Sequence, residues 1–257
     1  MPSTVLREKL TSRQLTLGSW ITLGHPAIAE IMAKAGFDWV VIDLEHSVMD
    51  ISLTGDLIRV IDLCGAAPLV RLTSNDPNQI KRVMDAGAHG IVVPMVNSAA
   101  DAAKAVAATR YPPRGTRGVG LGRAHGYGVS FQDYLAWQHE GPVVIAQIEH
   151  KDAIEQLDAI LTVPGIDGFI VGPYDLSCSM GIPGQFEDEA FVRSMTRIRE
   201  AGKRIGCPAG LHIVEPDLVR LESCIREGYT FIAYSVDMRM LDVSVRAGLT
   251  RAKELMK

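Results

Sequence analysis

Short apolar segments recur along the whole chain, and polar residues follow most of them. Each segment is apolar at consecutive positions rather than at alternate ones. This pattern is typical of parallel strands that are buried on both faces. Eight such strands are predicted, at residues 18–21, 39–44, 68–72, 91–96, 143–148, 168–172, 209–213 and 231–236.

Helical patterns lie between the predicted strands. Apolar residues recur at helical spacing in seven segments: 27–35, 79–86, 99–110, 153–161, 191–201, 216–227 and 240–256. Several of these segments are followed by a glycine, which readily adopts the positive φ that ends a helix: Gly36, Gly87, Gly202 and Gly228. The chain therefore alternates between strands and helices.

The strand–helix units have a nearly constant length. Four residues at or near the predicted strand ends are each 25 residues apart: Ile21, His46, Arg71 and Val96. Equal units with doubly buried strands are expected of a closed parallel barrel. An open doubly wound sheet would normally carry a Gly-x-Gly-x-x-Gly turn after its first strand, and none is present there. We therefore predict an α/β fold, with residues 1–257 forming a single (β/α)8 TIM barrel.

Two intervals are longer than the others. Val96 and Glu149 are 53 residues apart, and Asp175 and Ile213 are 38 apart. The first interval contains a segment rich in glycine and arginine, 111–123, which predicts a mobile cationic loop. We expect this loop to form a lid or an acid-binding wall over the barrel mouth; the alternatives are a solvated connection and a subunit contact.

Composition restricts the class of partner. The chain has 257 residues, with 26 Lys and Arg against 30 Asp and Glu, a net charge of −4. No global positive field is expected to hold nucleic acid or an anionic membrane. The four cysteines form no Cys-x-x-Cys pair, so we expect buried reduced thiols. Because neither a signal-peptide core nor an apolar stretch of about 20 residues is found, we expect a cytoplasmic protein that binds a small molecule.

Polar residues at the carboxyl ends of the strands are the candidate site, because these ends converge on the active site of such barrels. The spacing selects Asp43, Glu45, His46, Arg71, Gln147, Glu149 and Asp175.

Glu149 and Asp175 end neighbouring predicted strands. Two facing carboxylates repel each other unless a cation lies between them or one is protonated. No histidine or cysteine is in register with them, so the expected ion is hard: Mg²⁺ or Mn²⁺, with Co²⁺ as an alternative. Its open coordination positions imply a chelating substrate. Alternatively, both carboxylates pair with Arg71 or Arg123.

His46 is the candidate base, because imidazole exchanges protons near neutral pH. Asp43 could orient it, which requires the chain to turn at Glu45, since strand alternation points residues 43 and 46 to opposite faces. A structural histidine is the alternative. Arg71 ends an otherwise apolar strand, and we expect a ligand anion to compensate its charge.

The segment from Gly172 and Pro173 to Ser177 leads from a strand into a turn, where backbone amides near Asp175 to Ser177 could receive a carboxylate. Together with Gln147 and Arg71, this pocket suits a 2-oxo acid.

Several of these segments are specific enough to suggest a family. Between residues 17 and 236 the sequence resembles the metal-dependent pyruvate aldolases of the HpcH/HpaI family. The resemblance rests on six motifs: 36–46 (GFDWVVIDLEH), 75–81, 93–96 (VPMV), 110–120, 147–149 (QIE) and 172–177 (GPYDLS).

The resemblance implies a role for each matching residue. Glu149 and Asp175 would be the metal ligands, His46 the base supported by Asp43, and Arg71 a contact to pyruvate. Asp85 would reach a neighbouring subunit's site. The implied fold is a phosphoenolpyruvate/pyruvate-type barrel whose last helix is exchanged between subunits of a hexamer, built as a trimer of dimers.

Three segments depart from the usual family pattern, and all lie where an aldehyde would approach. They are 72–74, 121–128, and 209–212, which contains Leu211 and His212. We expect Leu211 to contact the substrate, and His212 could meet its tail. The aldehyde itself is not specified by the sequence.

The predicted activity is reversible cleavage of a 4-hydroxy-2-oxo acid into pyruvate, or a close 2-oxo acid, and an aldehyde. One alternative is a lyase acting on CoA thioesters, of the citrate lyase β or malyl-CoA type. Another is a 2-oxo-acid-binding protein without turnover. A Schiff-base mechanism would need a desolvated lysine, and Lys151 alone lies just past a strand end.

Overall fold

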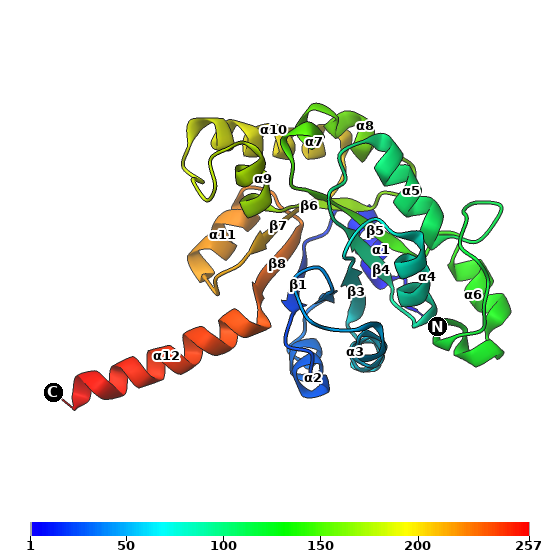
Figure 1. Ribbon diagram of the computed structural model, residues 1–257, viewed down its shortest axis with the longest axis horizontal. Coiled ribbons are helices and arrows are strands. Elements are labelled where there is room, and N and C mark those ends of the chain that lie inside the picture. Colours follow the sequence, from blue (N-terminus) through cyan, green and yellow to red (C-terminus); the bar gives the residue numbers. More distant parts are fainter. Residues whose placement is uncertain (1, 257) are drawn as a thin grey trace.

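Eight parallel strands form a closed barrel in sequence order, with β1 pairing to β8 (Figure 1). The structure is a computed structural model that describes residues 2–256. The strands are β1 (Thr16–Ile21), β2 (Trp39–Asp43), β3 (Ala67–Arg71), β4 (Gly90–Val93), β5 (Val143–Ile148), β6 (Gly168–Val171), β7 (Ala209–Ile213) and β8 (Phe231–Val236). The predicted barrel is confirmed.

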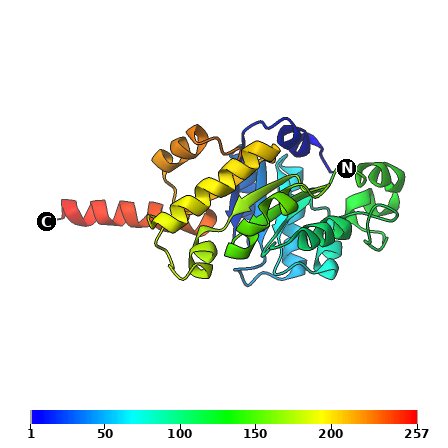
Figure 2. The ribbon, with the colours of Figure 1, turned by 90° about the horizontal axis from the view of Figure 1, so that it is seen from above.

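Helices surround the barrel and connect its strands (Figures 1 and 2). They are α1 (Val5–Thr11), α2 (Pro26–Lys34), α3 (Ile51–Leu63), α4 (Pro77–Asp85), α5 (Ala99–Thr109), α6 (Phe131–Trp137), α7 (Lys151–Glu155), α8 (Leu157–Leu161), α9 (Pro173–Ser179), α10 (Glu189–Ile205), α11 (Leu218–Arg226) and α12 (Asp237–Leu255), together with the 3-10 segment η1 (Arg123–Gly128).

The observed elements differ from the prediction in three respects. The helices α1, α3, α6 and α9 were not predicted, and the predicted helix 153–161 is divided into α7 and α8 at Gln156, which has φ −108° and ψ 7°. The 25-residue spacing does not mark strand ends uniformly. Ile21 and Arg71 end their strands, whereas His46 and Val96 lie three residues beyond theirs.

The core has two parts. One fills the barrel, where Trp39 stacks on Phe231 with ring centroids 4.0 Å apart. Leu6 and Leu10 of α1 belong to this interior cluster, so α1 closes the amino-terminal end of the barrel. The other part lies between the strands and the outer helices. The strands themselves are buried on both faces. The open end of the barrel is therefore lined by the polar residues at the carboxyl ends of the strands.

The arginine- and glycine-rich loop 111–123 lies at the amino-terminal end of the barrel, so the prediction of a lid or an acid-binding wall over the mouth of this barrel is wrong. The loop connects the end of α5 to α6 and the start of β5. Arg123, at its end, donates to Asp62 near the end of α3. Asp62 also contacts His89, which precedes β4. A segment between a helix and the next strand must lie opposite the carboxyl ends.

Helix α12 extends away from the barrel (Figures 1 and 2). Its one buried residue among those described is Asp237, which accepts hydrogen bonds from the backbone of Thr22 and Leu23 at the end of β1. Its exposed apolar residues include Leu241, at 57%, and Leu249, at 55%. The helix is therefore fixed at its base, where Met240 also packs against the core, and its exposed apolar side chains have no cover within residues 2–256.

All four cysteines are free, as predicted, but only Cys224 is buried and Cys178 is exposed. Over residues 2–256, no helix is both long enough and apolar enough to cross a membrane.

Candidate active site

Asp43 and Arg71 face each other on neighbouring strands. The register of β2 and β3 pairs them directly. Arg71 donates from Nε to Asp43 Oδ1 at 2.9 Å and from Nη2 to Oδ2 at 2.6 Å. The two side chains are only 13% and 3% exposed. Charge-assisted pairs with two hydrogen bonds fix orientation as well as charge. Contrary to prediction, the anion that compensates Arg71 is supplied by the chain itself.

The indole of Trp20 holds the guanidinium from a second side. Arg71 Cζ lies 4.5 Å from the centroid of the Trp20 ring, a cation–π distance. Trp20 is almost fully buried in β1. Arg71 is thereby held in one orientation while still lining the cavity at the barrel mouth.

Asp43 holds the backbone that carries His46, but not the imidazole ring. Its Oδ1 accepts the backbone N–H groups of Glu45, at 3.0 Å, and of His46, at 3.3 Å. The turn that the sequence analysis required at Glu45 is therefore present. The His46 ring itself is 62% exposed, and its Nε2 lies 3.9 Å from Glu45 Oε2.

Glu45 is a half-buried carboxyl that no sequence argument had given a role. Its Oε2 lies 3.2 Å from Arg71 Nη1 but forms no hydrogen bond among the described residues. Burial raises the pKa of Glu45 to about 7; Arg71 opposes the rise, and the charge of Glu149 adds to it. Glu45 can therefore exist in either protonation state near neutral pH.

Glu149 follows β5 and is 2% exposed. Its Oε1 accepts the backbone N–H of Met95 at 2.6 Å, and its Oε2 accepts from Gln147 Nε2. Met95 has a φ of 52°, and this left-handed backbone aims its N–H at the carboxylate. Despite these donors, burial raises the pKa of Glu149, and the charge of Asp175 adds to the rise.

Gly172 leaves space beside Glu149. A β-carbon at this position would lie 2.9 Å from Glu149 Oε2 and 3.0 Å from Glu149 Cβ. Gly172 is followed by α9, whose first turn carries the exposed Asp175. The predicted pair Glu149 and Asp175 is thus close enough to interact electrostatically.

Negative charge is in excess at the barrel mouth. The carboxylates of Asp43, Glu149 and Asp175 all add to the raised pKa of Glu45, and the guanidinium of Arg71 opposes them. Within residues 2–256, no three His, Cys, Asp or Glu side chains converge as a ready-made metal cage. A cation here would therefore need further ligands from outside the chain.

A cavity of about 370 Å³ occupies the barrel mouth. Six of the predicted site residues line it: His46, Arg71, Gln147, Gly172, Pro173 and Asp175. Trp20, Tyr174, His212 and Val214 line it as well. The cavity is large enough for a small oxo acid and brings these six residues together, whereas Asp43 and Glu149 are not among the residues that line it.

Two predicted substrate-binding residues point elsewhere. The Ser177 hydroxyl donates to the backbone oxygen of Tyr174 at 2.7 Å and accepts from the backbone N–H of Gly184 at 3.0 Å. It therefore ties α9 to the following loop. Leu211 is buried in the core outside the barrel and lines a different cavity.

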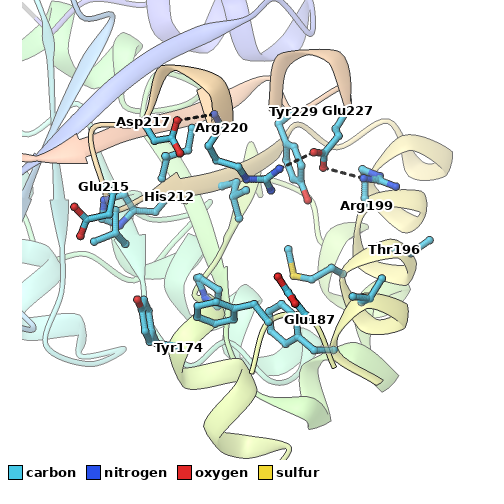
Figure 3. Close-up of a pocket in the computed structure, with 18 residues that line it drawn as sticks. Tyr174, Glu187, Thr196, Arg199, His212, Glu215, Asp217, Arg220, Glu227 and Tyr229 are labelled. Carbon is cyan, nitrogen blue, oxygen red and sulfur yellow. Dashed lines mark hydrogen bonds and ion pairs between the residues drawn. The ribbon is translucent and has the colours of Figure 1, made fainter. Parts of the chain in front are cut away.

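That second cavity, of about 710 Å³, lies between α10 and α11, outside the barrel (Figure 3). Arg220 and Arg199 share Glu227 at one side, with distances of 2.6 Å and 3.0 Å. The two cavities share Pro173, Tyr174, His212 and Val214. They are therefore adjacent at the barrel mouth.

Comparison with known proteins identifies the family. A family model described as HpcH/HpaI aldolase/citrate lyase matches residues 16–242. The chain belongs to this family. It is 38% identical over 242 residues to a pyruvate aldolase of Rhizobium etli, covering 94% of each chain. It is 38% identical over 253 residues to a hydroxypyruvate/pyruvate aldolase of Pseudomonas aeruginosa, covering 96% of this chain and 91% of that protein.

A solved structure of the same family has the same fold. The fold matches a HpcH/HpaI aldolase/citrate lyase family protein from Burkholderia cenocepacia with a TM-score of 0.93 and 32% identity, covering 98% of this chain and 100% of that one. The predicted HpcH/HpaI family, barrel fold and aldehyde-lyase class are thereby confirmed.

In this HpcH/HpaI family member, Asp85 is remote from the chain's own cavity. It ends α4 at the amino-terminal side of the barrel, where its carboxylate lies 3.5 Å from the buried Arg117. Burial raises the pKa of Asp85, although the nearby Arg117 opposes this. Its Oδ1 is buried and has no hydrogen-bond partner among the described residues. Asp85 can reach a barrel mouth only if that mouth belongs to another copy.

No lysine is among the buried residues that the structure describes, and Lys151 is exposed at the start of α7. The desolvated lysine that a Schiff base requires is therefore not found there. Sequence reasoning gave no role to Trp20, Glu45 or Met95. Two signals were available in the sequence. Arg71 at the end of an apolar strand could have suggested an aromatic partner such as Trp20, and the motif 93–96 contains Met95.

Proposed function

We propose that this chain is a divalent-metal-dependent aldolase that reversibly cleaves a 4-hydroxy-2-oxo acid into pyruvate, or a close 2-oxo acid, and an aldehyde. The observation that carries the proposal is the excess of carboxylates around Arg71, beside a cavity that Arg71 and Asp175 line and that is sized for a small oxo acid. The names of the aldolase relatives support the same reaction class.

The residues at the mouth fit a hard cation. Glu149 and Asp175 offer carboxylate oxygens, and Gln147 Oε1 is buried without a hydrogen-bond partner among the described residues. Gly172 adds no side chain beside Glu149 Oε2, whose side-chain donor is Gln147 Nε2. Oxygen ligands of this kind suit Mg²⁺ or Mn²⁺. When bound, such an ion would withdraw electron density from the oxo and carboxylate oxygens of the substrate and so favour the enolate.

Arg71 provides the fixed positive charge of the chain itself. Asp43 and Trp20 hold the guanidinium in place. Arg71 therefore needs little rearrangement to stabilise the negative charge that develops on the substrate oxygen. In cleavage, the C3–C4 bond breaks, its electron pair forms the enolate, and C4 becomes the aldehyde carbon. A proton from solvent then adds to C3 of the enolate and gives pyruvate.

His46 is the proposed base for the C4 hydroxyl. Its exposed ring lines the cavity at the rim, where it can exchange the proton with water between turnovers. In cleavage it removes the hydroxyl proton, and in synthesis it returns that proton to the new alkoxide. Asp43 acts through the backbone turn that places His46.

We also propose that copies of the chain exchange α12 and assemble as a hexamer, a trimer of dimers. The uncovered apolar residues of α12 support an exchange. The position of Asp85, at the end opposite the chain's own mouth, supports a role in a neighbour's site. The four free thiols are compatible with a cytoplasmic location.

Pyruvate release from a 4-hydroxy-2-oxo acid tests the proposal. We expect lactate dehydrogenase and NADH to detect pyruvate in the presence of Mg²⁺ or Mn²⁺, and EDTA to abolish it. Release that survives EDTA would contradict the metal-dependent mechanism. Binding of acyl-CoA without pyruvate release would favour a thioester lyase, and binding of oxalate without turnover would favour a binding protein.

A further inference from the structure

His212 is a polar residue inside the barrel mouth that the proposed reaction does not use. It lies on β7, and its ring stacks on Trp20 with centroids 5.2 Å apart and an interplanar angle of 25°. It lines the cavity that holds His46 and Arg71. In Figure 3 it stands on the same side of the second cavity as Tyr174. His212 is therefore placed between the two cavities.

The backbone fixes the tautomer of His212. Its Nε2 lies 3.1 Å from the backbone oxygen of Ser235 on β8. A carbonyl oxygen can only accept, so Nε2 carries the hydrogen and Nδ1 carries a lone pair. Burial lowers the pKa of His212 to about 4, so the ring is neutral at physiological pH.

Nδ1 of His212 remains open. Among the described residues it has no hydrogen-bond partner, and it is not among the polar atoms sealed away from solvent. A half-turn of the ring would keep the Trp20 stack but would lose the Ser235 bond, so that bond fixes where Nδ1 lies. The site thus presents a fixed hydrogen-bond acceptor to whatever enters the cavity.

We propose that His212 is a specificity-determining residue that accepts a hydrogen bond from a hydroxyl group on the aldehyde half of the substrate. The inference rests on the proposed aldolase function and narrows its substrate class to hydroxyaldehydes. An alkyl aldehyde of the same size would displace the water bound to Nδ1 and offer no hydrogen-bond donor in its place. The unpaired Nδ1 would then weaken binding of the transition state. The adjacent second cavity gives room for further substituents.

Two aldehydes of equal size test the inference. Glycolaldehyde and propanal differ by a hydroxyl in place of a methyl group, and each is added to pyruvate in the presence of Mg²⁺. The readout is the ratio of their kcat/KM values within one protein preparation, so partial unfolding cancels. His212→Phe keeps an aromatic ring to stack on Trp20 but removes the acceptor. His212→Asn keeps an acceptor near the position of Nδ1. His139→Leu, on the segment before β5, is the matched control.

We expect the ratio to fall about 10-fold in His212→Phe, to stay nearer to wild type in His212→Asn, and to be unchanged in His139→Leu. A ratio within about twofold of wild type in His212→Phe would overturn the inference, as would equal losses for both aldehydes, which indicate a positioning role through Trp20. Should His212→Phe not fold, His212→Leu gives the same comparison.

If wild-type protein converts neither aldehyde and exchanges no pyruvate protons, the proposed function itself fails. If the enzyme turns over but the ratio of kcat/KM values does not change in His212→Phe, only the inference about His212 fails.

Discussion

Arg71 and Asp43 are joined by two parallel hydrogen bonds, Nε to Oδ1 at 2.9 Å and Nη2 to Oδ2 at 2.6 Å, at the same level of neighbouring strands. Trp20 packs against the guanidinium at 4.5 Å. These contacts depend on the planar fork of arginine, which lysine lacks.

Replacing Arg71 with lysine should therefore reduce activity although the charge is kept. We expect kcat/KM for the 4-hydroxy-2-oxo acid to fall about 100-fold or more, measured by coupled pyruvate detection. Arg59→Lys is the control, because Arg59 forms an exposed pair with Asp56 and should leave activity intact. Near-wild-type activity of Arg71→Lys would show that only its charge matters.

Gly172→Ala should weaken metal binding without removing a ligand. Its β-carbon would press on Glu149 from 2.9 Å and displace the carboxylate. We expect the Kd for Mn²⁺ to rise about 10- to 100-fold, measured by the electron paramagnetic resonance signal of free Mn²⁺. Gly120→Ala is the control, since a β-carbon there meets nothing within 4 Å. Equal affinities in both variants would remove Glu149 from the proposed ligand set.

His46→Ala should separate proton transfer from metal binding. We expect kcat for cleavage to fall about 100- to 10,000-fold and the Kd for Mn²⁺ to change little, because the exposed ring is not among the proposed ligands. Loss of Mn²⁺ affinity in this variant would make His46 a ligand and refute its role as base.

Asp167 should make stability depend on pH. Burial raises its pKa to about 6 from 3.8, against the nearby Arg7. Between pH 3.8 and pH 6, Asp167 holds a proton in the folded state that it has released in the unfolded state. Its contribution to the free energy of unfolding is therefore complete below pH 3.8 and is lost as pH rises through 6. Relative to Asp167→Asn, the wild type should lose about 2–3 kcal/mol between pH 4 and pH 7, measured by urea unfolding. Asp133→Asn, on an exposed site, should show no such trend; a flat difference for Asp167→Asn would contradict the raised pKa.

The exposed apolar residues of α12 should hold the proposed assembly together. We expect the double variant Leu241→Glu and Leu249→Glu to sediment as smaller species than wild type, because charges would enter the apolar interface. Lys253→Glu, on the same helix, is the control. A wild-type protein that sediments as a monomer would contradict the exchange of α12.

The barrel and much of its site were predictable because consecutive apolar positions and near-constant spacing both follow from burial of parallel strands. Strand ends then selected Asp43, Arg71, Gln147 and Glu149 without reference to any structure. The pairing of Asp43 with Arg71 was not predicted, since it depends on the register between β2 and β3 rather than on either segment alone.

Other features depend on contacts between distant parts of the chain. The role of Ser177 is decided by a bond to Gly184 across a loop. The orientation of Nδ1 in His212 is decided by Ser235 on another strand. The position of loop 111–123 is different, because the order of the predicted helix 99–110 and strand 143–148 already placed it at the amino-terminal end, and the lid prediction did not use that order.

Exchange of the pyruvate methyl protons in D₂O tests the central claim most directly, because it needs the enolate but no aldehyde. Proton NMR would follow the methyl signal with Mg²⁺ or Mn²⁺ and with EDTA. We expect exchange that requires the metal and is lost in Glu149→Gln. Exchange that persists in EDTA would contradict the account and return attention to a lysine, and the absence of exchange with every metal would show that the chain forms no pyruvate enolate.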